Sequence, residues 1–377
     1  MNVLIAIDSF KGSLSSTQLA NAIEEGIFSV DQTINVKKMP IADGGEGTVT
    51  ALTEALNGKI IETIVHDPLM RKITAEYGLL PNQTAVIEMA QASGLPLLQP
   101  HEWNPLYTTT YGLGDLIKDA LKHQVKTIII GIGGSATNDA GIGMLASLGY
   151  QFYDADNNKL EPIGLNLRYI HKVDTSLAIK LPEDLTIIVA CDVNNPLYGP
   201  NGAAHIFGPQ KGANEESVHL LDQGLKHYAS YIYNIESIDL QKIKGTGAAG
   251  GLPASLVPYL KATLKPGIEI IFDLINIESH IKAADLIITG EGKIDHQTLM
   301  DKAPMGIINY AKKYQKEVIV LTGNLTEEGK ELLQYGVKIY NINENSFSQD
   351  YLNPSVAFKN TKNTIINLFK AKNYHLK

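Results

Sequence analysis

Apolar runs alternate with amphipathic helical patterns along most of this 377-residue chain, and this alternation constrains its fold most. Several runs are apolar at every position, which is typical of parallel strands covered on both faces. Strand followed by helix, repeated, predicts an α/β protein with a mainly parallel sheet. The expected strands are residues 3–7, 36–41, 127–132, 185–190, 286–289, 317–321 and 337–341. The expected helices are residues 16–29, 47–56, 112–122, 139–148, 215–233, 305–313 and 326–335.

Residues 58–89 break this rhythm, because three strand patterns follow one another there with turn sequences between them. We therefore expect a partly antiparallel region. The length of the chain favours two domains. We expect a discontinuous α/β domain of residues 1–60 and 265–377, with a second α/β (α+β) domain, residues 61–264, inserted into it.

A glycine-rich turn follows one of the expected strands, where residues 128–143 read IIIGIGGSATNDAGIG. Glycines let a ligand approach the backbone closely. The first N–H groups of a helix have no internal partner and carry partial positive charge. If the helix begins at this turn, Gly133, Gly134, Ser135 and Thr137 form an anion site, and phosphate is the usual anion in such sites.

Composition narrows the classes of partner and compartment. A net charge of −8 argues against a general nucleic-acid binder. The single cysteine, Cys191, allows no intrachain disulfide and fits a reducing compartment. The chain has no run of 18 apolar residues and no basic leader before its first apolar run. We expect a cytoplasmic enzyme with neither nucleic-acid nor membrane partners.

Five of the apolar runs lead into Gly, Ser, Asp, Glu or Lys, at the edge where an open α/β sheet binds ligands. A turn needs glycine, but it does not need acids and lysines beside the glycine. The recurrence therefore indicates a polar ligand site. The five segments are DSFKGSLSS (8–16), ADGGEGT (42–48), GGSATND (133–139), CDVNNPL (191–197) and GEGKIDHQT (290–298).

The first two segments also have purely structural interpretations. Lys11, on one turn with Asp8, can neutralise a phosphate or carboxylate as a point charge. The serines that follow can simply cap the next helix. In ADGGEGT, Asp43 and Glu46 favour a helix N-terminus without any ligand. Its paired glycines and acids equally suit a polar ligand or a metal-bound water.

The last two segments supply further candidate catalytic residues, and GEGKIDHQT has the densest mix of charged side chains. Asp192, directly after a buried run, can hold Mg²⁺, orient a substrate hydroxyl, or form an Asx-turn before Pro196. Asp295 is a candidate general base or metal ligand, and Lys293 is a candidate phosphate partner. Cys191 is more typical of a small buried hydrophobe than of a nucleophile.

Two other classes of protein compete with a phosphate-handling enzyme. Gly131, Gly133 and Ala136 satisfy the dinucleotide fingerprint, and Asp154 follows about 20 residues on. This pattern predicts an NAD(P)-dependent hydroxy-acid dehydrogenase, but it leaves the lysines and carboxylates of the other strand ends without a role. The third possibility is a non-catalytic protein that binds small anions.

Seven motifs resemble those of the bacterial glycerate kinases, occur in the order found in that family and extend to about residue 335. They are DSFKGSLSS, PIADGGEGT, GIGGSATNDAGIGML, ACDVNNPLYGPNGAA, FGPQKGA, GTGAAGGL and ITGEGKIDHQT. The resemblance implies ATP-dependent phosphorylation of D-glycerate with Mg²⁺, usually to 2-phosphoglycerate. It also implies two α/β domains around a cleft, one of them flavodoxin-like.

This resemblance and the chemistry of phosphoryl transfer together suggest a role for each strand end. The sequence does not determine the oligomeric state, and a homodimer is one of the possible states. The expected catalytic residues are Lys11, Asp192, Lys293 and Asp295, the two acids dividing Mg²⁺ binding and hydroxyl activation. The expected cofactor-binding residues are Gly133, Gly134, Ser135, Thr137, Gly290 and Glu291. The expected metal ligands are Asp192 and Glu291, and the expected substrate-binding residues are Asp8, Ser9, Asp43 and Gly44.

Overall fold

The computed structural model describes residues 1–39, 41, 52–53, 56–299, 303–344, 350 and 352–372. The chain forms two compact units. Unit 1 comprises Met1–Gly44 and Ile268–Lys377, and unit 2 is Gly45–Gly267. Among the described residues, no helix is both long and apolar enough to span a membrane.

Unit 1 contains a five-stranded parallel sheet with the spatial order β13-β12-β11-β1-β2. Numbered within the unit, this is the flavodoxin-like order 2-1-3-4-5. The α/β class with a mainly parallel, flavodoxin-like sheet is thereby confirmed. The strands are β1 (Asn2–Ile5), β2 (Asn35–Lys38), β11 (Leu286–Ile294), β12 (Glu317–Leu325) and β13 (Lys338–Asn341).

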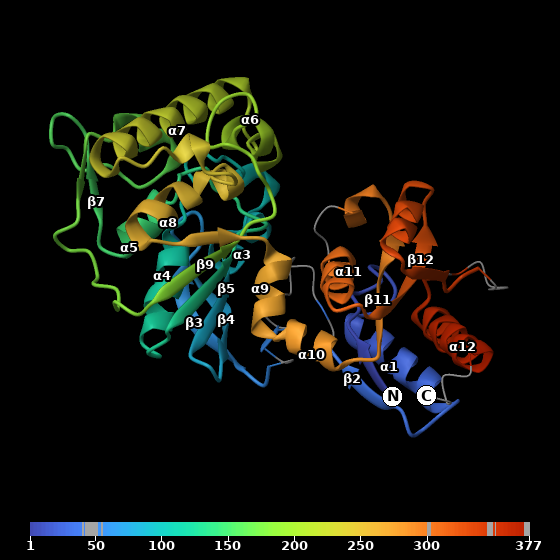
Figure 1. Cartoon of the computed structure of the whole chain (residues 1–377). Helices are drawn as coiled ribbons and strands as arrows, with labels where there is room; N and C mark the ends of the chain where they lie inside the picture. Colours follow the sequence, from blue (N-terminus) through green and yellow to red (C-terminus); the bar gives the residue numbers. More distant parts are fainter. Residues whose placement is uncertain are drawn as a thin grey trace. The chain divides into compact units, whose positions relative to one another are not determined.

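Helices pack against this sheet, with α1 and α12 lying beside each other (Figure 1). α1 begins with a capping box, because the Ser15 hydroxyl accepts from the Gln18 N–H and the Gln18 side chain accepts from the Ser15 N–H. Gly26 lets the two helices approach, since a Cβ there would lie 2.9 Å from Ile365. The helices of unit 1 are α1 (Ser16–Phe28), α9 (Gly267–Leu274), α10 (Ile277–Ala283), α11 (Ala303–Lys313) and α12 (Pro354–Lys372), with 3-10 helices at His296–Leu299 and Glu328–Tyr335.

The strands of unit 1 are buried on both faces, which explains their uninterrupted apolar sequences. Val3 and Ile5 belong to a core that includes side chains of α1 and α12. Leu4, which points to the opposite face, is also almost fully buried. Each position of such a strand must therefore be apolar, because neither face is exposed to water.

Unit 2 contains a six-stranded sheet with the order β10-β9-β6-β5-β4-β3. In this sheet β5, β6, β9 and β10 run parallel, while β3, β4 and β5 form antiparallel pairs, so the expected antiparallel region is confirmed. These strands are β3 (Lys59–His66), β4 (Lys72–Leu80), β5 (Thr84–Glu88), β6 (Thr127–Gly131), β9 (Thr186–Ala190) and β10 (Thr263–Lys265). A separate antiparallel ribbon is formed by β7 (Gln151–Tyr153) and β8 (Lys172–Asp174).

The helices of unit 2 surround this sheet, and α7 is the longest of those described (Figure 1). They are α3 (Ala90–Ser93), α4 (Tyr111–Leu121), α5 (Ile142–Ser147), α6 (Ala203–Phe207), α7 (Glu215–Glu236) and α8 (Pro253–Leu260). The 3-10 helices are Leu95–Leu97, Pro100–Glu102, Gly164–Tyr169, Pro209–Lys211, Leu240–Lys242 and Ala248–Gly251.

Two predicted helices differ from the observed ones. The helix expected at residues 139–148 begins only at Ile142, because Asp139 accepts the N–H groups of Gly141 and Gly143 and so precedes the helix as a cap. Residues 328–335 form a 3-10 helix in place of the expected α-helix. The helix expected at residues 47–56 lies mostly outside the described residues.

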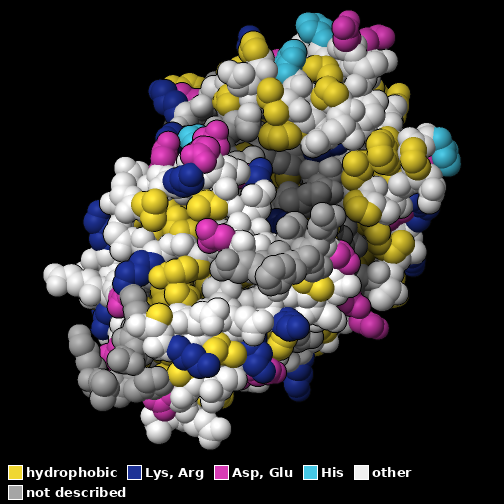
Figure 2. All heavy atoms as spheres, turned by 90° about the vertical axis from the view of Figure 1, so that its right-hand side faces the viewer, with side chains coloured by type: hydrophobic (Ala, Val, Ile, Leu, Met, Phe, Trp, Pro, Cys, Tyr) yellow, Lys and Arg dark blue, Asp and Glu magenta, His cyan; other side chains and the backbone are white. Residues whose placement is uncertain are grey.

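Charges of both signs are mixed on the face shown in Figure 2, where lysine and arginine side chains lie among acidic ones. The described surface also has exposed ion pairs, such as Lys338 with Glu317 and Lys313 with Glu278. Exposed pairs of this kind contribute little to stability.

Candidate active site

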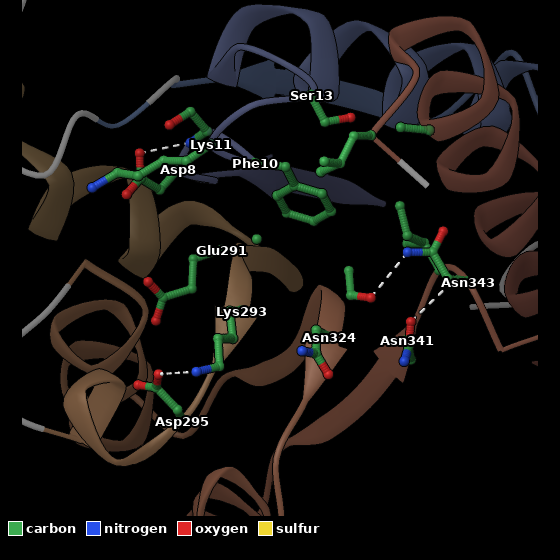
Figure 3. A pocket seen from close by; sticks show the side chains of 16 residues that line it. Asp8, Phe10, Lys11, Ser13, Glu291, Lys293, Asp295, Asn324, Asn341 and Asn343 are labelled. Carbon is green, nitrogen blue, oxygen red and sulfur yellow. Dashed lines mark hydrogen bonds and ion pairs between the residues drawn. The ribbon is translucent and has the colours of Figure 1, made fainter. Parts of the chain in front are cut away.

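A cavity of about 810 Å³ lies at the carboxyl ends of β1, β11, β12 and β13 in unit 1 (Figure 3). In the flavodoxin-like order, the topological switch point falls between the first and third strands, here β1 and β11. Ligands of open α/β sheets bind at that point, outside the carboxyl ends of the strands. The volume is in the range of ligand pockets, about 300–1,000 Å³.

The end of β11 supplies Glu291, Lys293 and Asp295 to one side of the cavity (Figure 3). Glu291 is 8% exposed and accepts a hydrogen bond from the Thr298 hydroxyl. Lys293 Nζ lies 3.1 Å from Asp295 Oδ2, and the two side chains are 57% and 21% exposed. A half-exposed ion pair is weak. Lys293 can therefore exchange Asp295 for an anionic ligand at little cost.

The loop after β1 supplies Asp8, Ser9 and Lys11 to the same cavity. Asp8 is 5% exposed, and its Oδ1 accepts from the Ser9 N–H at 2.6 Å. The Asp8 N–H donates to the Gly290 carbonyl, which ties this loop to β11. Lys11 is exposed and lines the cavity. Two of the five polar segments, residues 8–16 and 290–298, thus meet in one pocket.

Glycines in β11 allow the backbones of the neighbouring segments to approach this strand closely. A Cβ on Gly292 would lie 3.1 Å from the Phe10 Cα. A Cβ on Gly290 would lie only 2.0 Å from the Leu321 carbonyl oxygen of β12. Gly290, expected from the sequence to bind the cofactor, therefore has a packing reason to be glycine.

Three asparagines on a further side of the cavity were missed by the sequence reasoning: Asn324, Asn341 and Asn343 (Figure 3). The Asn343 amide donates to the Gly323 carbonyl at 2.9 Å and accepts from Asn360 at 3.0 Å. These residues follow or end the apolar runs of β12 and β13. The signal that revealed the other strand ends, apolar residues leading into polar ones, was present here too.

The glycine turn lies in unit 2 and differs from its predicted form. Gly133 and Gly134 are exposed, whereas Ser135 and Thr137 are buried. The turn does not open a helix, because α5 starts only at Ile142. The first three N–H groups of α5 donate to the Asp139 carbonyl, the Asp139 carboxylate and the Thr110 hydroxyl, so they are not available to a ligand. An anion at this turn would meet loop backbone instead.

Asp192 also lies in unit 2, where it is exposed and its Oδ1 accepts from the Gly267 N–H at 2.8 Å. Gly267 is the last residue of unit 2, so this bond lies within that unit. The neighbouring Cys191 thiol is partly buried, and burial raises its pKa, as expected for a thiol that is not a nucleophile. The predicted substrate residues Asp43 and Gly44 lie outside the described residues.

The positions of the carboxylates test whether the chain can hold the expected Mg²⁺ ion. The two predicted ligands, Asp192 and Glu291, belong to different units. Within the described part of the chain, no group of three or more His, Cys, Asp or Glu side chains is placed to hold a metal by itself. Mg²⁺ bound to a nucleotide needs only one or two carboxylates besides phosphate oxygens and water. Asp8, Glu291 and Asp295, which line one cavity, fit that requirement.

The dinucleotide interpretation fails on geometry. It requires a second parallel strand after α5, ending near Asp154. β7 instead pairs antiparallel with β8, outside the main sheet. Asp154 accepts the N–H groups of Asp156 and Asn158 at 2.9 and 2.8 Å in a local turn. Asp154 therefore does not follow a parallel strand of the main sheet, as a ribose-binding acid would.

The flavodoxin-like sheet, with lysines and carboxylates in a cavity at its switch point, defines an α/β enzyme that acts on a small anionic ligand. Residues 3–370 match the model of the glycerate kinase family, and the chain belongs to this family of kinases.

Relatives of known family and a solved structure support this family assignment. The chain is 45% identical over 338 residues to a glycerate kinase of Bacillus subtilis, covering 89% of this chain and 88% of the relative. It is likewise 45% identical to the glycerate 2-kinase of Escherichia coli, with 89% of each chain covered. A crystal structure from Salmonella typhimurium LT2, of a protein provisionally named glycerate kinase 2, superposes with a TM-score of 0.87 at 42% identity over 98% of both chains.

Proposed function

We propose that this kinase transfers the terminal phosphoryl group of ATP to the 2-hydroxyl of D-glycerate, with Mg²⁺, in the cytoplasm. Membership of the glycerate kinase family supports the substrate. The name of the Escherichia coli relative, a glycerate 2-kinase, supports the position of transfer. The dehydrogenase alternative finds no support in the geometry around Asp154.

The observation that carries the proposal is the cavity of unit 1, which gathers two lysines and three carboxylates from two strand ends. Catalysis of phosphoryl transfer is mainly positioning and stabilisation of spread negative charge. Lys11 and Lys293 supply positive charge, and both can contact phosphate or the glycerate carboxylate as point charges. When bound, Mg²⁺ would neutralise charge on the phosphates, and Asp8, Glu291 and Asp295 are the carboxylates of this cavity that could hold it.

Two acids share the remaining roles in this proposal. Asp295, beside Lys293 at the cavity, is placed either to accept the proton of the attacking hydroxyl or to hold Mg²⁺. The sequence assigns the other role to Asp192, which belongs to unit 2. Its bond to the Gly267 N–H uses Oδ1, which leaves Oδ2 for a ligand among the contacts described.

The test is an ADP-release assay with D-glycerate, ATP and Mg²⁺, followed by ³¹P and ¹H NMR of the product. We expect ADP release that requires all three components, with L-glycerate as the matched control for stereochemistry. No ADP release with D-glycerate would refute the proposal. A phosphorus signal coupled to the two C3 protons, in place of the single C2 proton, would replace 2-phosphoglycerate by 3-phosphoglycerate.

A further inference from the structure

A buried lysine lies beneath the glycine turn of unit 2. Lys211 ends the 3-10 helix Pro209–Lys211, and it is 2% exposed. Its Nζ donates to the Ser135 hydroxyl oxygen and to the Thr137 carbonyl, both at 2.7 Å. Lysines are almost never fully buried unless a carboxylate pairs with them. Among the described residues, Lys211 has no such partner within ion-pair distance, so its bonds go to neutral oxygens.

The turn above this lysine has the geometry of a backbone anion site. Gly134 adopts a left-handed conformation, with φ of +70°. The turn is held on one side only, where Leu95 donates to Gly134 and Ala136 donates to Ser93. Among the described residues, the N–H groups of Gly133 and Gly134 have no hydrogen-bond acceptor. Successive unpaired N–H groups around a left-handed residue form a concave site for an anion.

We propose that the turn of residues 133–137 binds an anionic group of a substrate and that Lys211 is its positioning residue. This inference rests on the proposed function, which supplies two candidates: a phosphate of ATP or the carboxylate of D-glycerate. Because the Ser135 oxygen accepts from Lys211, its hydroxyl proton is left to donate to the anion. Because Lys211 also binds the Thr137 carbonyl, that oxygen is kept away from the anion.

The protonation state of Lys211 connects this site to pH. Burial lowers the pKa of Lys211 to about 7, and the charge of Asp139 opposes that shift. The other groups bonded to Nζ, Ser135 and Thr137, are neutral. The protonated lysine favours a bound anion. Binding should therefore be strongest below pH 7 and weaken as the pH rises through the pKa of Lys211.

The test replaces Lys211 with methionine, which has similar length and no charge, and uses Lys226→Met, an exposed lysine on α7, as the control. KM for ATP and for D-glycerate, kcat and the melting temperature are measured for each variant. We expect KM for one substrate to rise about tenfold, the scale of one hydrogen bond assisted by charge, while KM for the other stays unchanged. The substrate whose KM rises is the one whose anionic group binds at the turn. Unchanged values of both KM constants with a lower melting temperature would assign Lys211 a purely structural role and overturn the proposal.

Two further measurements keep the inference separable from the proposed function and from misfolding. In the wild-type protein, KM for one of the two substrates should rise between pH 6 and pH 9, and flat profiles for both would overturn the proposal without any variant. If the wild type releases no ADP, the proposed function fails. Titration with inorganic phosphate, followed by NMR, then tests the site alone, and equal affinity in wild type and Lys211→Met would overturn it.

Discussion

Replacing Asp139 with asparagine should destabilise unit 2 by about 3–4 kcal/mol, because this carboxylate is fully buried and accepts four hydrogen bonds. Its Oδ2 accepts from the N–H and hydroxyl of Thr110, each at 2.8 Å, and from the Gly143 N–H at 3.2 Å. Its Oδ1 accepts from the Gly141 N–H at 3.1 Å. These bonds join the start of α4 to the start of α5.

The magnitude follows from what asparagine can still accept. If its oxygen faces the three donors at Oδ2, each bond loses its charge and weakens by about 1 kcal/mol. The Gly141 N–H then faces an amide NH₂ and stays unpaired, which costs about 1–3 kcal/mol. Removing a buried charge recovers part of the desolvation cost. The net loss corresponds to a fall of about 10 °C in melting temperature for a unit of this size.

Urea and thermal denaturation followed by circular dichroism measure the effect, with the exposed Asp156→Asn in the same unit as control. The control should match the wild type. A loss below about 1 kcal/mol for Asp139→Asn would refute the reasoning, since it falls within the range of a single neutral hydrogen bond. Burial raises the pKa of Asp139, and a carboxyl already protonated in the native protein would give that result, because asparagine resembles it.

Three further predictions concern the strand ends. Asp295→Asn should lower kcat by about 100-fold or more if this acid is the general base, and near wild-type turnover in the ADP assay would remove it from that role. Gly290→Ala should cost about 3 kcal/mol, because its Cβ would lie 2.0 Å from the Leu321 oxygen; an unchanged urea midpoint would contradict this. Since burial raises the pKa of Cys191, a disulfide reagent at pH 7 should label it more slowly in the native protein than in urea, and equal rates would show an accessible thiolate.

Local patterns predicted the elements well where burial imposes a simple rule. The run around Val3–Ile5 is apolar at every position because both faces of β1 are covered. The antiparallel pairing of β3, β4 and β5 followed from strand patterns separated only by turn sequences. The start of α5 was misplaced, because a helical pattern does not reveal that the Asp139 side chain will cap it.

Site residues could be identified by type but not by place. Asp8 and Lys293 were recognised as polar residues at strand ends, yet no local pattern shows that β1 pairs with β11 and brings both to one cavity. No local pattern marked Lys211 as a buried residue, because burial of a lysine depends on what packs around it. The same holds for Asp192, whose bond to Gly267 joins segments far apart in the chain.

The amino-acid sequence by itself determined the α/β class, the family and the chemical character of the strand ends, because periodicity and motifs depend on neighbours along the chain. The tertiary structure decided which strand ends share a pocket, through the flavodoxin-like order that sets β1 beside β11. It also decided that the glycine turn offers loop N–H groups above a buried lysine and not the end of a helix. These outcomes depend on pairing and burial between distant segments, which no local pattern specifies.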